Sequence, residues 1–154
     1  MPKIESNVTV DIDIETAFKL SQTYGEIRYM WDPFVKEQHL LNGATEAGVG
    51  VQTRTTSRHG ISMTTQYTSY KAPNHVGMKM VEGPMFFKSF SGGWNFTKEG
   101  KSVIVTWRYN FVCKPKIFQP IMNFFGTKIL QKDIDKRLQA FANACKNQDI
   151  TKLL

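Results

Sequence analysis

The strongest constraint on the fold is a run of segments, between about residue 50 and residue 112, in which apolar and polar side chains alternate. Alternation with a period of two is typical of strands that have one buried and one solvated face. Turn signals separate the segments at residues 58–60, 73–74 and 99–101. The pattern therefore predicts an antiparallel meander with strands at 50–57, 61–72, 75–83, 86–98 and 102–112.

The sequence of the N-terminal third predicts further strands and also short helices. Residues 3–11 alternate as a strand, and residues 14–31 have the composition of one or two short helices, capped by Asp13 and broken near Tyr24-Gly25. Pro33 should end this helical region, because a proline disfavours helical geometry in the residue before it. Residues 35–41 predict one more strand, which brings the sheet to about seven strands.

A single long helix is predicted at the C-terminal end of the chain. Pro120 suits the first turn of a helix, where its missing N–H costs nothing. Large residues then recur at helical spacing for about 27 residues, or roughly 40 Å, which is enough to cross a sheet. The positions are Ile121, Phe125, Ile129 (or Leu130), Ile134, Leu138, Phe141 and Cys145. Within this helix, Phe124 is either an exposed apolar contact or a neighbour of a close helix–sheet approach at Gly126.

The strand phases indicate which side of the sheet the helix covers. In an antiparallel sheet one face is commonly packed and the other wet. The predicted covered face is rich in aromatic residues and methionine, and the helix should lie on it. It comprises Ile61, Met63, Thr65, Tyr67, Val76, Met78, Met80, Phe90, Gly92, Trp94, Phe96, Val103, Val105, Trp107, Tyr109 and Phe111. The predicted class is therefore α+β.

Length and composition exclude several classes of protein. The chain has 154 residues, which fits one domain spanning 1–154. It shows neither the apolar centre of a signal peptide nor an apolar run long enough to span a bilayer. Cys113 and Cys145 are isolated thiols, so we expect a cytoplasmic protein without disulfides. The three histidines and two cysteines form no ligand pattern, so we expect no metal and no cofactor.

In the order and spacing of these elements the chain resembles the START-like, Bet v 1-like (SRPBCC) superfamily, in particular its polyketide cyclase/dehydrase and lipid-transport branch. The resemblance covers about residues 3–147. It is carried by VDIDIETAF, WDPF, GVGVQTR, SGGWNF, VTWRYNF and the terminal amphipathic helix. It implies a helix-grip fold, in which a curved antiparallel sheet wraps around the long C-terminal helix.

The resemblance also implies an elongated apolar cavity between the sheet and the helix. Its expected ligand is a small hydrophobic molecule such as a lipid, an isoprenoid or a polyketide, and its expected role is binding or transport. Combined with the strand phases, this gives a candidate lining. The residues are Trp31, Phe34, Met63, Tyr67, Met78, Met80, Phe90, Trp94, Trp107, Tyr109, Phe118, Met122 and Phe125.

A cyclase or dehydrase acting in the same cavity is the first alternative, and it would need a positioned acid or base. Tyr67 and Tyr109 are predicted to point inward, where each could hold a ligand oxygen. Asp32 fits an Asx-turn or a helix end, and His59 fits an exposed turn. The remaining polar candidates are Tyr24, Arg54 and Arg108. No pair among them has the pattern of a nucleophile and its base, so no catalytic residue is assigned and an enzyme is not the favoured interpretation.

The second alternative is a partner-binding module, and it comes from the location of the positive charge. The net charge is +7; residues 1–97 hold nine basic and nine acidic residues, whereas residues 98–154 hold eleven and four. Lys128, Lys132, Lys136 and Arg137 lie on the terminal helix and could contact an anionic membrane surface. The same residues could simply form a solvated helix face. Nucleic-acid binding is not expected, because the aromatic residues are predicted to point inward.

Overall fold

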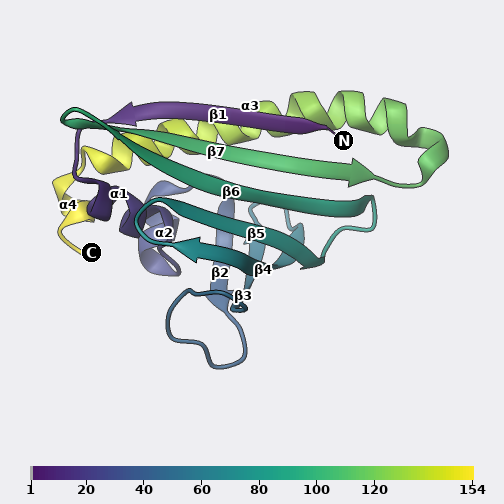
Figure 1. Ribbon diagram of the computed structural model, residues 1–154. Coiled ribbons are helices and arrows are strands. Elements are labelled where there is room, and N and C mark those ends of the chain that lie inside the picture. The colour runs from purple at the N-terminus through teal and green to yellow at the C-terminus, as the bar shows by residue number, and fades with distance from the viewer. Residues whose placement is uncertain (1) are drawn as a thin grey trace.

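The alternating segments form one antiparallel sheet in the computed structural model, which describes residues 2–154. Within these residues the sheet has seven strands in the order β1-β7-β6-β5-β4-β3-β2 (Figure 1). The strands are β1 (Lys3–Val10), β2 (Val35–Leu40), β3 (Gln52–Ser57), β4 (Ser62–Lys71), β5 (His75–Glu82), β6 (Phe87–Glu99) and β7 (Ser102–Cys113). The helices are α1 (Ile14–Ser21), α2 (Glu26–Trp31), the short 3-10 helix η1 (Lys116–Phe118), α3 (Gln119–Cys145) and α4 (Gln148–Thr151).

The predicted fold class is confirmed. The sheet is curled, and α3 lies along its concave side as the helix-grip arrangement requires (Figure 1). The predicted break between the two short helices is also present, because Gly25 has a φ of 65° and precedes α2. Only glycine adopts this left-handed conformation without strain. Asp13 caps α1 as expected, since its side chain accepts a hydrogen bond from the backbone N–H of Thr16 at 2.9 Å.

The strand phases were predicted correctly on the two longest strands. On β7, alternate residues from Val103 to Cys113 are buried. Trp107 pairs in register with Trp94 of β6, and their rings stack with centroids 4.0 Å apart. Both indoles are at least 95% buried. This stack lies on the concave face and forms the floor on which α3 rests.

The long helix follows the prediction over only half of its length. Ile134, Leu138 and Phe141 are completely buried, so the C-terminal half packs on the sheet as expected. In the N-terminal half, Ile121 and Ile129 are 60% and 67% exposed, so the predicted continuous buried stripe is wrong there. This half approaches the sheet closely at Gly126, where an added Cβ would lie 3.3 Å from the ring of Phe111. The space between this half of α3 and the sheet remains open.

Two adjacent glycines in β6 allow the neighbouring strands to approach closely. A Cβ on Gly93 would lie 2.4 Å from the carbonyl oxygen of Val76, and one on Gly92 would lie 2.6 Å from that of Arg108. Real Cβ atoms do not approach backbone oxygens so closely, hence larger residues would force the strands apart. The two glycines thus fix the sheet geometry beside the Trp94–Trp107 stack.

We predict that Gly93→Ala lowers the free energy of unfolding by about 1–3 kcal/mol, because the strands must shift to accommodate the methyl group. Chemical denaturation measures this loss. Gly48→Ala is the matched control, since a Cβ at Gly48 meets no atom within 4 Å and its φ is not positive. Equal stability of the two variants would contradict the close approach.

Candidate functional site

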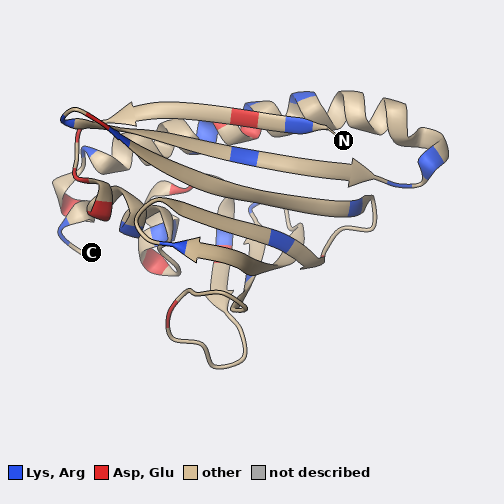
Figure 2. Cartoon of the chain, in the orientation of Figure 1, with Lys and Arg blue, Asp and Glu red and all other residues tan. Residues whose placement is uncertain are grey.

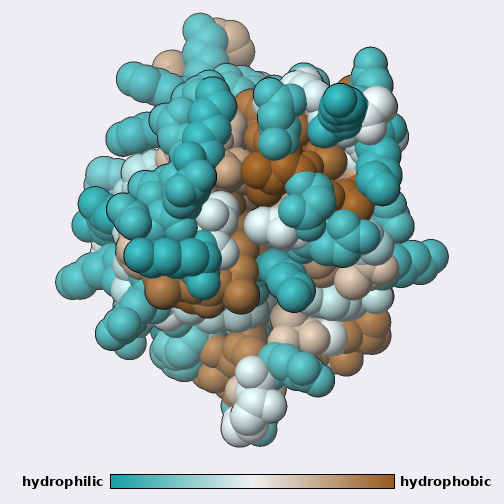
Figure 3. Space-filling model, turned by 90° about the vertical axis from the view of Figure 1, so that its left-hand side faces the viewer, coloured by the Kyte–Doolittle hydropathy of each residue, from teal (hydrophilic) through white to brown (hydrophobic). Residues whose placement is uncertain are grey.

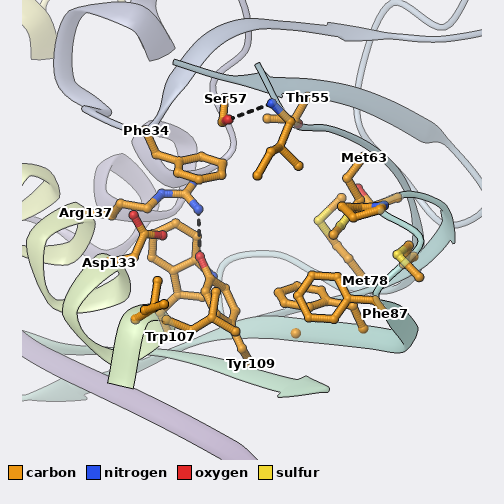
Figure 4. Close-up of a pocket in the computed structure, with 18 of the residues that line it drawn as sticks. Phe34, Thr55, Ser57, Met63, Met78, Phe87, Trp107, Tyr109, Asp133 and Arg137 are labelled. Carbon is orange, nitrogen blue, oxygen red and sulfur yellow. Dashed lines mark hydrogen bonds between the residues drawn. The ribbon is translucent and has the colours of Figure 1, made fainter. Parts of the chain in front are cut away.

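A cavity of about 710 Å³ lies between the concave face of the sheet and α3. This volume is within the range of small-molecule sites, roughly 300–1,000 Å³. Most of the wall is hydrocarbon, sulfur and aromatic ring (Figure 4). The apolar lining residues are Phe34, Ile61, Met63, Tyr67, Met78, Met80, Phe86, Phe87, Phe90, Trp94, Trp107, Met122, Phe125, Ile129 and Leu130.

One end of the cavity carries a buried arginine that the helix projects inward. Arg137 of α3 is 93% buried, and its guanidinium lies between the rings of Phe34 and Trp107, 4.4 Å from each ring centroid. Its Nη1 donates to the hydroxyl of Tyr109 at 2.7 Å (Figure 4). Stacking on two aromatic faces suits a weakly hydrated planar cation and holds it in one orientation.

The charge of Arg137 is balanced by Asp32, which follows α2 and is fully buried. Arg137 donates to Asp32 from Nε at 3.1 Å and from Nη2 at 2.8 Å. Arg28 of α2 donates to the same carboxylate from Nε at 2.8 Å, and its Nη1 donates to the carbonyl of Ser21 at 2.7 Å. We call Arg28, Asp32, Arg137 and Tyr109 the buried charge cluster. It ties α1, α2, α3 and β7 together.

The ionisation of the cluster follows from these contacts. Burial alone would raise the pKa of Asp32, but the positive charges of Arg137 and Arg28 outweigh it and lower the pKa to about 2. Burial would lower the pKa of Arg137, yet Asp32 and Tyr109 raise it overall. Burial raises the pKa of Tyr109 to about 12. At neutral pH the cluster therefore holds two cations, one carboxylate and a neutral phenol.

A second carboxyl group lies beside Arg137 at the rim of the cavity. Burial raises the pKa of Asp133 above its ordinary value, although the charge of Arg137 opposes this shift. Asp133 lines the cavity and is directed toward it (Figure 4). This end of the cavity therefore presents an acid, a phenol and a cation within one small region.

Further polar groups line the same cavity. The hydroxyl of Tyr67 donates to Oε1 of Gln22 at 2.8 Å. In contrast, the hydroxyl of Tyr24 and Oε1 of Gln38 are buried without a hydrogen-bond partner among residues 2–154. Burial raises the pKa of Tyr24 far above its ordinary value, so this phenol stays neutral. The cavity is thus apolar along its length and polar toward α2 and β2.

The structure brings together most of the residues that the sequence selected. Of the predicted lining, all except Trp31 and Phe118 line the cavity. Trp31 instead packs in the core, where its ring meets Phe141 at 5.5 Å and its Nε1 donates to Thr23. Phe118 is 55% exposed, because the chain turns into α3 before reaching the cavity.

One prediction about charged residues is wrong, and another was correct but incomplete. Arg137 was expected on the basic surface of the helix with Lys128, Lys132 and Lys136, and this was wrong for Arg137, which is buried against Asp32. Asp32 does form the expected turn, since its Oδ1 accepts from the N–H of Phe34 at 3.0 Å. Its larger role, as the counter-ion of two arginines, was missed. His59 is exposed as predicted and lies at the cavity rim.

Two signals in the sequence could have revealed the cluster. Asp32 follows Arg28 by four residues and comes directly after a short helix, which is the spacing of an ion pair. Arg137 lies three residues after Ile134 and four before Phe141, hence within the apolar stripe. The sequence contained no comparable signal for the position of Asp133 beside Arg137. Its neighbours Lys132 and Lys136 suggested only charge pairing on the surface.

Two classes of feature are absent from the described part of the chain. Among residues 2–154, no group of three His, Cys, Asp or Glu side chains is arranged to hold a metal ion. None of the helices in residues 2–154 is both long and apolar enough to cross a membrane.

Comparison with known protein families shows one family whose model matches nearly the whole chain. The model of the family described as polyketide cyclase/dehydrase and lipid transport matches residues 1–146. The chain belongs to this family. Membership suggests hydrophobic-ligand binding or a polyketide cyclase-like role. No curated protein matches the chain in sequence.

Solved structures share the same architecture at low sequence identity. A protein from Thermus thermophilus superposes with a TM-score of 0.76 at 15% identity, over 92% of this chain and 95% of that one. A START superfamily protein from Mycobacterium smegmatis gives a TM-score of 0.75 at 15% identity over 99% of both chains. The di-domain ARO/CYC protein BexL gives 0.72 at 11% identity, over 95% of this chain and 50% of BexL. At these identities the likeness shows the fold alone.

We predict that Asp32→Asn destabilises the protein by about 3–5 kcal/mol at neutral pH, because two buried guanidinium groups lose their counter-ion. The wild type should also lose stability in acid. The pKa of Asp32 is lowered to about 2, so its contribution is complete above the unfolded value of about 4 and is lost as the pH falls toward 2. Denaturant unfolding at several pH values measures both effects.

Glu5→Gln provides the matched control for this prediction. Glu5 pairs with Arg108 on the surface, where both side chains are 38% exposed. An exposed pair contributes at most about 1 kcal/mol. If Asp32→Asn were no more destabilising than Glu5→Gln, the buried charge cluster would not hold the helices as described.

Proposed function

We propose that residues 1–154 act as one domain that binds a small hydrophobic ligand, such as a lipid, an isoprenoid or a polyketide-like molecule. The observation that carries this proposal is the 710 Å³ cavity, whose lining is mainly aromatic and methionine side chains. An interior of this kind is normally filled by the protein itself, because cores pack at close to crystal density. Membership of a family that includes lipid-transport proteins supports the same function.

The lining also favours a ligand with one polar end. The apolar walls formed by Met63, Met78 and Phe87 face the polar end formed by Arg137 and Asp133 (Figure 4). Apolar burial would supply affinity, and the polar groups would fix the orientation. The unpartnered hydroxyl of Tyr24 and Oε1 of Gln38 are further candidates to bind a ligand oxygen or hydroxyl.

The affinity expected from burial is sufficient for a carrier or sensor. Burying about 500 Å² of apolar ligand surface at about 25 cal/mol per Å² gives about 12 kcal/mol. Subtracting about 4 kcal/mol for association leaves about 8 kcal/mol, which corresponds to a roughly micromolar dissociation constant. This range permits both uptake and release.

Native mass spectrometry of the purified chain tests whether it carries such a ligand. We expect an apolar molecule to co-purify and to leave on denaturation. Thr65→Phe should lower the occupancy at least tenfold, because Thr65 lines the cavity and the added ring would fill part of it. The same loss should appear in the binding of the fluorescent probe anilinonaphthalene sulfonate.

Thr68→Phe is the control for this experiment, since Thr68 is exposed on the same strand and does not line the cavity. It adds the same ring outside the cavity and should leave binding unchanged. A chain that carries no apolar molecule and binds the probe equally well in both variants would contradict the proposal.

A polyketide cyclase-like activity is the second candidate, favoured by one feature of the cavity. Asp133, Tyr109 and Arg137 meet at its polar end, where they offer an acid and hydrogen-bond donors to a carbonyl-rich substrate. We expect Asp133→Asn to abolish turnover of such a substrate without preventing its binding. Unchanged turnover in this variant would exclude Asp133 as the acid, and binding alone would remain.

A further inference from the structure

Large apolar side chains are exposed around one end of the cavity. They come from the β5–β6 loop and from η1 with the first half of α3, and we call them the apolar ridge. The ridge consists of Met85, Phe86, Ile117, Phe118, Ile121, Phe124, Phe125 and Ile129. Their exposed fractions run from 41% for Phe86 to 88% for Met85. Exposed apolar side chains gathered in this way mark an interaction surface rather than ordinary scatter.

The two segments of the ridge lie at the same end of the molecule, on the right in Figure 1. The backbone N–H of Lys114 donates to the carbonyl of Phe86 at 2.9 Å, which holds the loop beside the chain that leads into α3. Phe86, Phe125 and Ile129 both line the cavity and reach solvent. The ridge therefore borders an exposed part of the cavity rim.

Along η1 and the first half of α3 the charges beside the ridge have a single sign, whereas the β5–β6 loop follows the exposed Glu82. Lys114, Lys116, Lys128 and Lys132 are exposed, and the sequence contains no Asp or Glu between Glu99 and Asp133. The right-hand part of α3 accordingly shows basic segments and no acidic ones (Figure 2). Nζ of Lys128 lies 4.4 Å from the ring centroid of Phe124, so the charge and the apolar surface are in contact. The opposite end of the molecule is predominantly hydrophilic (Figure 3).

We propose that the apolar ridge docks on the surface of an anionic lipid bilayer, with its large side chains among the acyl chains and its lysines at the headgroups. Apolar residues flanked by lysines are the composition of helices that lie in the membrane interface. A second copy of the chain fits less well, because a symmetric contact would bring like charges together. Docking goes beyond the proposed ligand binding and does not require it. It would place the part of the cavity rim beside the ridge against the bilayer.

Co-sedimentation with vesicles tests the proposal. The full chain is mixed with vesicles of phosphatidylcholine alone or of phosphatidylcholine with phosphatidylserine, at low and at high salt. We expect binding to the anionic vesicles, with weaker binding at high salt. Lys116→Gln/Lys128→Gln should lower the partition coefficient roughly thirtyfold, since each lysine near an anionic surface contributes about one kcal/mol. Ile117→Gln/Phe124→Gln should lower it at least tenfold.

Two controls carry the same chemical changes elsewhere. Val49→Gln removes an apolar side chain that is 68% exposed in the β2–β3 loop, and Lys101→Gln removes an exposed charge at the β6–β7 turn. Both should sediment with vesicles like the wild type. Thermal unfolding confirms that each variant is folded, and the two double variants test the ridge independently if one of them unfolds.

Three results would overturn the proposal. The first is that the wild type binds neutral and anionic vesicles equally well, and the second is that both double variants bind the anionic vesicles as well as the wild type. The third is that light scattering shows a wild-type dimer that Ile117→Gln/Phe124→Gln dissociates. None of Lys116, Ile117, Phe124 and Lys128 lines the cavity, so these variants should still bind anilinonaphthalene sulfonate in solution. Loss of vesicle binding with intact dye binding would isolate docking from the proposed ligand binding. A wild-type chain that binds the anionic vesicles but neither carries an apolar molecule nor binds the dye would refute only the proposed ligand binding.

Discussion

The carboxylate of Asp32 is held between two guanidinium groups, and all three side chains are buried. Removing three charges from water is costly, and the cost is offset only when every group finds its partners. Arg137 meets this condition with Asp32, Tyr109 and two aromatic faces, and Arg28 meets it with Asp32, the carbonyl of Ser21 and Trp31. Because these groups come from α1, α2, α3 and β7, satisfying them fixes the helices relative to the sheet.

This anchor explains why the helix can leave a cavity open. The buried residues of α3 begin at Ile134, just before Arg137, and continue to Cys145. The residues before them contact the sheet at Gly126 and Gln131 and leave space above Met63, Met78 and Phe90. One half of the helix therefore supplies stability and the other half forms a roof. The cavity runs from the charged anchor to the apolar ridge, which gives it a polar and an apolar end.

The sequence predicted the sheet well, since a strand of alternating residues has only two faces and the aromatic one must be covered. Trp94 and Trp107 were placed correctly by this argument alone. The buried residues of the long helix were harder to predict. Periodicity shows which residues share a face of a helix, but not whether that face packs against the sheet. Ile121 and Ile129 continue the stripe of Ile134 and Leu138, yet they remain exposed. Arg137, in contrast, was predicted to be exposed but is buried. Its counter-ion lies 105 residues away in the chain, so the local sequence did not reveal the pair.

Methionine methyl NMR tests the central claim, ligand binding inside the cavity, most directly. Met63, Met78, Met80 and Met122 line the cavity, whereas Met30 is 53% exposed and lies outside it. On titration with a fatty acid, we expect the four cavity methyl groups to shift and to show contacts to the acyl chain, while Met30 stays unchanged. Shifts confined to Met30 and to Met85 on the ridge, with the four cavity signals unmoved, would contradict the account.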